Sequence, residues 1–350
     1  MEWKVAADRI RPVSQRWLDT AWQRLDDLTK PRRSLGLLEE LAARYAAIRE
    51  EASPRITGKA VFVFAGDHGV VDEGVSAYPP EVTALMVNTF LAGGAGINVL
   101  ARCAGAEVHV VDIGMATPLP DAPGLIQRCV RRGTGNLRRE PAMSREEAEQ
   151  GIEVGVEMAR TARERGVSVV ATGDMGIGNT TPSSALFAAL LPAAPREVTG
   201  RGTGLQDEAL NHKVGVIEAA LERASGESND PVSALAALGG LEIAGICGLC
   251  LGGAAHRMAV MVDGFISSAG ALIAMRINPA VADYLVFSHC SVEKGHRVFF
   301  EREGLRPVLD LDMRLGEGTG AAVAMQILED GVRVYNEMST FADAGITPGA

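Results

Sequence analysis

Short apolar runs that end in polar, glycine-containing loops recur along the chain from residue 55 onward, and helix-length stretches separate them. The runs are continuously apolar, which is typical of strands buried on both faces of a parallel sheet. The pattern therefore predicts an α/β fold with a parallel, doubly wound, Rossmann-like sheet. The predicted strands are 60–64, 107–111, 167–171, 259–262, 284–287 and 308–311.

Both ends of the chain have a helical pattern instead. Apolar residues recur at helical spacing over 13–28 and 34–50, and one more helix is predicted after Asp330 that packs on this N-terminal pair. We therefore expect a small helical domain of residues 1–55 plus 331–350. The α/β domain, residues 56–330, carries the active site at the carboxyl ends of its strands.

Two interior segments depart from the alternation of strands and helices. Residues 115–150 are rich in loops, and Ser144 with Glu147 matches a capping box that begins a helix. Residues 205–255 have a helical pattern with a break near 226–231.

Composition and charge exclude several classes of function. The 350 residues have a net charge of −10, so no nucleic-acid partner is expected, because phosphate backbones bind basic faces. Five cysteines, an odd number in a large chain, argue against a disulfide scaffold and indicate a reducing compartment. The charged N-terminus lacks the apolar core of a secretory signal. The best candidates among the uncharged stretches, 243–255 and 175–195, are too short or too polar to span a membrane. We expect a cytoplasmic protein without a membrane partner.

Three glycine clusters follow predicted strands or helices, at 173–178, 200–204 and 316–320. Ligands of open parallel sheets bind at the carboxyl ends of the strands, and glycine lets backbone N–H groups approach an anion there. None of the clusters has the Lys-Ser/Thr of a P-loop. Together they predict a phosphate-containing ligand. Lys213 could add a positive charge to the same phosphate, and a lone surface lysine is the alternative.

Acidic side chains lie at the same strand ends: Asp67, Asp112, Asp174, Asp263 and Glu317. The aspartates could be helix caps, Asp112 in particular. A divalent metal would need them together with His68, His289 and His296, but the chain has neither a His-Glu-x-x-His motif nor a tight acidic pair. The Cys247–Cys250 pair lacks the second pair of a zinc site. We expect no metal and no cofactor.

Glu317 differs from the other acidic residues because it lies between two glycines just before a predicted helix. Desolvation by a bound apolar ligand would raise its proton affinity, so that it could act as a general base. An exposed loop glutamate is the alternative.

Several longer motifs resemble one known family, in the right order, from about residue 28 to 340. They are Lys30-Pro31 with Ser34-Leu35-Gly36, Ala65-Gly66-Asp67-His68-Gly69-Val70, Val75-Ser76-Ala77-Tyr78-Pro79, Gly176-Ile177-Gly178-Asn179-Thr180-Thr181, Gly200-Arg201-Gly202-Thr203-Gly204, Asp263-Gly264-Phe265, Ser288-His289 with Gly295-His296, and Arg314-Leu315-Gly316-Glu317-Gly318-Thr319-Gly320. The chain is similar to nicotinate-nucleotide–dimethylbenzimidazole phosphoribosyltransferase of cobalamin lower-loop synthesis.

The resemblance implies a homodimeric enzyme that transfers the phosphoribosyl group of nicotinate mononucleotide to 5,6-dimethylbenzimidazole. It implies that Glu317 is the catalytic base and that Asp174 and Asp263 are catalytic-site residues. The implied phosphate- and ribose-binding residues are Gly176, Gly178, Asn179, Gly202, Gly204, Lys213 and Ser291. The implied base-binding residues are Ser76, Tyr78, Pro80, Leu85, Asn88 and Leu315.

Four positions depart from the family pattern. Pro80 and Leu85 replace glutamines, Asp174 replaces a glutamate, and Arg33 replaces a glycine. An apolar base pocket distinguishes one missing methyl group by only about 1–3 kcal/mol, so the preferred base is left open. The alternatives are a sister transferase that uses adenine or a phenolic base, and a non-catalytic nucleotide-binding protein.

Overall fold

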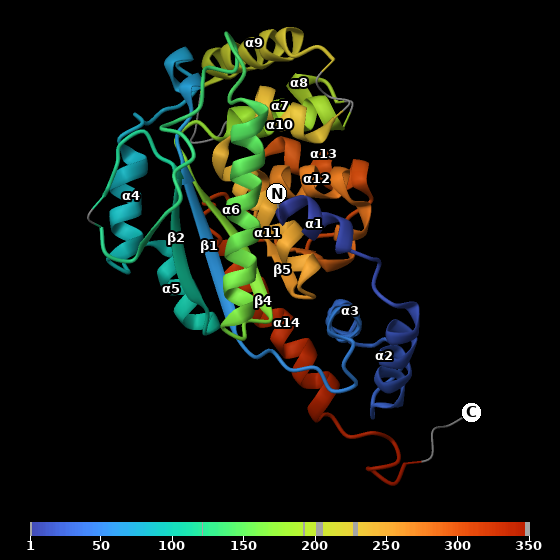
Figure 1. Cartoon of the computed structure of the whole chain (residues 1–350). Coiled ribbons are helices and arrows are strands. Elements are labelled where there is room, and N and C mark those ends of the chain that lie inside the picture. Colours follow the sequence, from blue (N-terminus) through green and yellow to red (C-terminus); the bar gives the residue numbers. More distant parts are fainter. Residues whose placement is uncertain (1, 121, 192, 201–205, 227–229, 347–350) are drawn as a thin grey trace.

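The computed structural model describes the chain except residues 1, 121, 192, 201–205, 227–229 and 347–350. Its centre is a six-stranded sheet in the order β3-β2-β1-β4-β5-β6, with every pairing parallel (Figure 1). The strands are β1 (Lys59–Gly66), β2 (Glu107–Gly114), β3 (Leu125–Gln127), β4 (Val169–Met175), β5 (Ala259–Val262) and β6 (Leu285–Phe287). This is the strand order of doubly wound dinucleotide-binding sheets, so the predicted fold class is confirmed.

One strand prediction is wrong. Residues 308–311 lie outside the sheet, where Leu309 forms only an isolated parallel bridge with His289. Asp310 interrupts the apolar run after two residues, and Asp310 and Leu311 are exposed, so the segment cannot continue as a buried strand. The sixth strand is β3, within the segment that was predicted to be rich in loops.

Helices cover both faces of the sheet (Figure 1). One face carries α6 (Arg145–Glu164), α11 (Leu241–Ala255) and α12 (Phe265–Ile277), and the other carries α4 (Val82–Leu91), α5 (Gly96–Ala104) and α14 (Thr319–Glu337). The backbones of α6 and α11 touch, because a Cβ on Gly248 would lie 1.9 Å from the carbonyl oxygen of Ile152. The glycine content of the chain therefore serves close helix packing as well as loops.

The predicted helical stretch after residue 205 is confirmed as α9 (Asp207–Arg223), α10 (Pro231–Leu238) and α11. The predicted capping box is also present, because the backbone N–H of Glu147 donates to Ser144 Oγ and that of Ser144 to Glu147 Oε2. The remaining helices are α7 (Thr180–Leu190), α8 (Pro195–Val198), α13 (Lys294–Glu303) and the 3₁₀ helices η1 (Gly69–Glu73) and η3 (Pro279–Tyr284).

The N-terminal helical pair is α2 (Gln15–Asp27) and α3 (Leu37–Arg49), and an unpredicted helix, α1 (Glu2–Arg9), packs on α6 and α11. The last helix does not begin after Asp330, as predicted, but at Thr319. Its far end does pack on the N-terminal pair, where Tyr335 shares a core with Leu25 and Ala42. Since α14 runs through position 331, the proposed domain boundary falls inside one helix, and the division stays a prediction.

The segment Val82–Ala104 is long and apolar enough to cross a membrane by length and composition alone, although the sequence patterns predicted no membrane-spanning segment. Core helices pass the same test. In the structure the segment is two helices, α4 and α5, separated by a turn in which Gly93 has φ 77°. Both helices pack on the central sheet.

Candidate functional site

The loops that follow β4, β5 and β6 enclose a cavity of about 180 Å³ at the carboxyl end of the sheet. Its lining residues are Asp174, Asn179, Thr180, Gly264, Phe265, Ile266, His289, Ser291, Glu293, Arg314, Leu315 and Gly316. The fold thus brings together four of the predicted site residues, which come from three loops: Asp174, Asn179, Ser291 and Leu315. This is where open parallel sheets bind their ligands.

Glu317 lies beside this cavity in the tight turn before α14. Its backbone is left-handed, with φ 64°, an uncommon conformation for a residue other than glycine. The side chain is only 5% exposed, so the alternative of an exposed loop glutamate is wrong. Burial raises the pKa of Glu317, while a hydrogen bond from the backbone N–H of Ile97 to Oε2 (3.3 Å) lowers it. A carboxyl group with raised proton affinity is suited to general-base chemistry.

Asp263 holds the Glu317 turn in place. Its Oδ2 accepts the backbone N–H of Gly318 (3.1 Å), and its Oδ1 accepts that of Ala321 (2.9 Å). These N–H groups belong to the start of α14, where a helix has no internal acceptors and favours negative charge. Among the strand-end aspartates, Asp263 therefore acts as the helix cap. Asp112 does not, since it pairs with Arg132 and accepts the N–H of Met115 in a loop.

Asp174 lies at the end of β4, against the same turn. A Cβ on Gly316 would lie 3.3 Å from Asp174 Oδ2, and this oxygen accepts a hydrogen bond from the Asn179 side-chain amide (2.9 Å). Burial, together with the nearby charge of Asp263, raises the pKa of Asp174 well above its ordinary value. Three buried carboxyl groups thus surround one corner of the site, which favours a ligand that carries or develops positive charge there.

A second group of residues, at the start of α7, favours an anion. Lys213 is fully buried, so the alternative of a surface lysine is wrong. Its Nζ donates to Thr180 Oγ1 (2.6 Å) at the start of α7. The free backbone N–H groups at a helix N-terminus favour an anion. Burial lowers the pKa of Lys213 to about 8, opposed by the negative charge of Glu293. A buried ammonium group beside a helix N-terminus is suited to bind a phosphate.

The other predicted phosphate-binding residues lie around this group. Gly176 must be glycine, because a Cβ there would lie 2.2 Å from the carbonyl oxygen of Gly66. Gly178 has a left-handed backbone, with φ 90°. Ser291 is anchored by its backbone N–H, which donates to His296 Nδ1 (2.9 Å). Gly202 and Gly204 lie outside the described residues.

The predicted base-binding residues are less closely gathered. Of these residues only Leu315 lines the cavity. The others lie on α4 or on the loop before it: Ser76, Tyr78, Pro80, Leu85 and Asn88. The apolar side chains of Tyr78, Leu85 and Leu315 are more than half exposed. Leu315 and Glu317 both reach the start of α5, since a Cβ on Gly96 would lie 3.0 Å from Leu315 Cδ2 and 3.5 Å from Glu317 Oε2.

Three residues that line the cavity were not among the predicted site residues: His289, Glu293 and Arg314. His289 was named only as a conceivable metal ligand. All three belong to the motifs that carry the family resemblance, and position directly after a strand was the signal available for His289. In the structure His289 is buried, with Nε2 3.9 Å from Asp263 Oδ1. Among the described residues, no group of three or more His, Cys, Asp or Glu side chains is arranged to hold a metal ion. The expectation of a reaction without metal stays a prediction.

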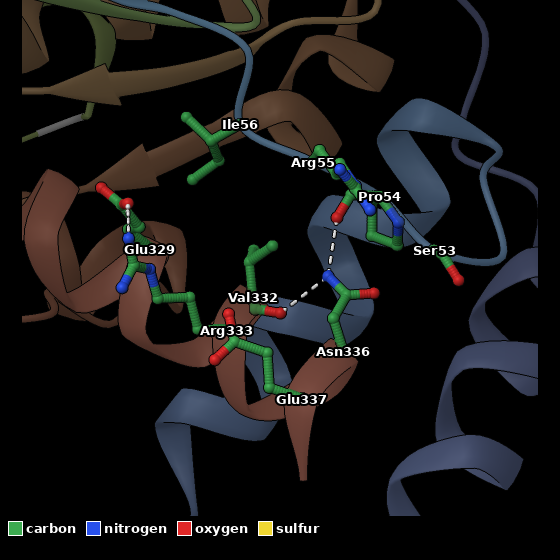
Figure 2. Close-up of a pocket in the computed structure, with 9 residues that line it drawn as sticks. All are labelled: Ser53, Pro54, Arg55, Ile56, Glu329, Val332, Arg333, Asn336 and Glu337. Carbon is green, nitrogen blue, oxygen red and sulfur yellow. Dashed lines mark hydrogen bonds and ion pairs between the residues drawn. The ribbon is translucent and has the colours of Figure 1, made fainter.

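A larger cavity of about 460 Å³ lies near the amino end of β1 (Figure 2). It is formed by residues 53–56 and by the second half of α14. Its polar groups bind one another, since Asn336 donates to the carbonyl oxygens of Pro54 (2.8 Å) and Val332 (2.9 Å) and Arg333 pairs with Glu329 (3.2 Å). Size alone would favour this cavity as the functional site. The carboxyl groups, the buried lysine and the position at the strand ends all favour the smaller cavity instead.

Comparison with known proteins gives a consistent result. The phosphoribosyltransferase family model matches residues 10–346. The nicotinate-nucleotide–dimethylbenzimidazole phosphoribosyltransferases of Geobacter sp. (strain M21) and Geobacter sulfurreducens are 55% and 56% identical to this chain, each alignment covering 98% of both sequences. The crystal structure of CobT from Thermus thermophilus superposes with a TM-score of 0.91 at 48% identity, covering 95% of this chain and 100% of that one. The resemblance inferred from the motifs is confirmed, and the chain belongs to the nicotinate-nucleotide–dimethylbenzimidazole phosphoribosyltransferase family.

Proposed function

We propose that the protein transfers the phosphoribosyl group of nicotinate mononucleotide to 5,6-dimethylbenzimidazole. The products are α-ribazole 5′-phosphate and nicotinate, and the reaction belongs to the assembly of the cobalamin nucleotide loop. The observation that carries the proposal is Glu317, a buried carboxyl group of raised pKa that a helix cap holds beside the cavity. A chain of this family with such a group is equipped for base-assisted transfer.

The nucleotide binds with its phosphate at the anion-binding residues around the start of α7. Lys213 and the start of α7 supply positive charge to the phosphate, and the loop that contains Gly176 and Gly178 lets backbone N–H groups approach it. The pyridinium ring and C1′ then face the buried carboxyl groups. A bound cation lowers the pKa of Asp174 again, so that the carboxylate stabilises the positive charge that develops at C1′.

The transfer exchanges one C–N bond for another. The bond between C1′ and the pyridinium nitrogen breaks, and its electron pair stays on nicotinate, which leaves as a neutral ring nitrogen. The free nitrogen of the imidazole ring attacks C1′ from the opposite face, which inverts β to α. Glu317 accepts the proton from the other imidazole nitrogen, so the product does not retain a positive charge.

Positioning contributes more than proton transfer to this mechanism. General-base assistance is worth about 10²–10⁴-fold in rate, or about 3–5 kcal/mol. Holding two reactants in line supplies about 7–11 kcal/mol. The rigid turn that Asp263 fixes serves the second purpose, which makes Asp263 a positioning residue in this proposal.

The proposal includes the base-binding role of α4 and the loop before it, with Pro80 and Leu85 in place of amide side chains. It also includes a homodimer in the cytoplasm. The five cysteines are free thiols, which supports a reducing compartment. Sedimentation equilibrium tests the oligomeric state.

Product analysis tests the reaction. The protein is mixed with nicotinate mononucleotide and dimethylbenzimidazole in the presence of a chelator, and the products are separated chromatographically. We expect nicotinate and α-ribazole 5′-phosphate in equal amounts. Turnover with adenine or a phenol only would identify the sister activity, and nucleotide binding without turnover on any base would refute the transferase function.

A further inference from the structure

A chain of hydrogen bonds joins the helix that carries the expected base-binding residues to the loop that carries the expected phosphate-binding residues. Thr83, in the first turn of α4, is fully buried, and its Oγ1 lies 2.6 Å from Asp67 Oδ1. The backbone N–H of Ile177, between Gly176 and Gly178, donates to the same Oγ1 (3.2 Å). One hydroxyl group therefore connects α4, the loop after β1 and the loop after β4.

The direction of these bonds is fixed. Because an ionised carboxylate can only accept, the Thr83 hydroxyl group donates its proton to Asp67, and its oxygen accepts the N–H of Ile177. Asp67 is in turn held on its other oxygen, where Oδ2 accepts the backbone N–H of Ala116 (2.8 Å). Its backbone is held as well, since its N–H donates to the carbonyl oxygen of Gly114 (3.0 Å). Asp67 is thus a fixed acceptor. It holds the Thr83 hydroxyl group in place, and that hydroxyl group accepts the backbone N–H of Ile177.

The two elements that Thr83 joins differ in how firmly they are packed. The nucleotide loop lies directly on the loop after β1, because a Cβ on Gly176 would clash with Gly66 and one on Gly178 would lie 2.6 Å from Val71 Cγ2. Helix α4 is covered on one face only, and Leu85 on its outer side is 63% exposed. Within the described residues, the bond from Ile177 is the one hydrogen bond between α4 and this loop.

We propose that Thr83 is a positioning residue, which sets the base-binding helix in register with the nucleotide-binding loop so that the attacking nitrogen lies in line with C1′. This inference rests on the proposed function. It follows from the geometry of transfer, since the base approaches from the α4 side while the phosphoribosyl group is held by the loop after β4. Without the hydroxyl group, each substrate still binds at its own site. The two sites are then no longer held in a fixed position relative to each other.

Three variants test this role. Thr83→Val keeps the shape and removes both hydrogen bonds, whereas Thr83→Ser keeps the hydroxyl group. Thr89→Val is the matched control, because it makes the same change on the same helix, where the Thr89 hydroxyl donates only to the carbonyl oxygen of Leu85 (2.9 Å). We expect kcat at saturating substrates to fall about ten- to a hundredfold in Thr83→Val, since a misplacement of about 1 Å costs about 10²-fold. Thr83→Ser should recover most of the rate, and Thr89→Val should match the wild type.

Nucleotide binding distinguishes a positioning role of Thr83 from a merely structural role. Calorimetry with nicotinate mononucleotide alone should give the same dissociation constant for Thr83→Val as for the wild type, because the loop after β4 stays packed on Gly66. Hydrogen exchange on the wild-type protein does not depend on any variant folding. Saturating dimethylbenzimidazole should slow exchange of the Ile177 amide, because an ordered α4 keeps its acceptor in place.

Three outcomes would each overturn the proposal. The first is an unchanged kcat in a folded Thr83→Val variant, and the second is an equal loss of kcat in Thr83→Val and Thr83→Ser. The third is a rate of hydrogen exchange at the Ile177 amide that is the same with and without dimethylbenzimidazole. These outcomes are distinct from failure of the proposed function. In that case the wild-type protein itself would form no ribazole phosphate from the two substrates.

Discussion

Replacing Glu317 by glutamine removes the proposed base with little other change. Glutamine has nearly the same shape, and its side-chain oxygen can still accept the N–H of Ile97. The turn itself is held through backbone groups by Asp263, so the substitution does not release it. Only the capacity to take a proton is lost.

The expected loss in kcat is about two to four orders of magnitude, which is the usual contribution of a general base. The dissociation constant of nicotinate mononucleotide should stay unchanged, because the proposed phosphate contacts, Lys213 and Thr180, do not involve the Glu317 side chain. Single-turnover formation of α-ribazole 5′-phosphate, measured beside nucleotide binding by calorimetry, gives both quantities. Glu301→Gln, an exposed change of the same kind on α13, is the control.

The pH dependence gives an independent check. A base acts in its deprotonated form, so kcat/KM falls as the pH falls through its pKa. Burial raises the pKa of Glu317 above the ordinary 4.5, and the acid limb of the profile should therefore lie above that pH. Glu317→Gln should lack this limb. Near-wild-type turnover in the variant, or an acid limb that survives the substitution, would remove Glu317 from the base role.

Three further predictions concern the phosphate, the core and the base pocket. Burial lowers the pKa of Lys213 to about 8, so its positive charge is lost as the pH rises through that value. KM for nicotinate mononucleotide should therefore rise over the same pH range. Lys213→Met should have a high KM that does not change with pH in this range. Gly248→Ala should lower the free energy of unfolding by about 1–3 kcal/mol, because the new Cβ would lie 1.9 Å from a backbone oxygen of α6. Gly215→Ala, on α9 with nothing within 4 Å, should instead raise it by about 0.5–1 kcal/mol in the same denaturant titration. Leu85→Gln supplies an amide and should change the ratio of kcat/KM for dimethylbenzimidazole over benzimidazole by up to about 100-fold, and an unchanged ratio would place Leu85 outside the base pocket.

The class of fold and the end of the sheet that carries the chemistry follow from local patterns along the chain. Continuous apolar runs such as 60–64 are typical of strands buried on both faces of a parallel sheet covered by helices, and the loops at their carboxyl ends then share one edge. The order of the motifs was sufficient to recognise the family. Local spacing also placed Glu317 between glycines before a helix, where a carboxyl group has a special environment.

The roles of several of these residues depend on packing between segments that are distant in the chain. Asp263 caps α14, whose first residues lie 55 positions further along the chain, and no local pattern contains that pairing. Lys213 has the sequence context of a surface lysine, but it is buried because α9 packs on α7. Residues 308–311 have an apolar pattern that resembles a strand, although they remain outside the sheet. In each case the outcome depends on which distant segment supplies the partner, and that is settled when the helices pack on the sheet.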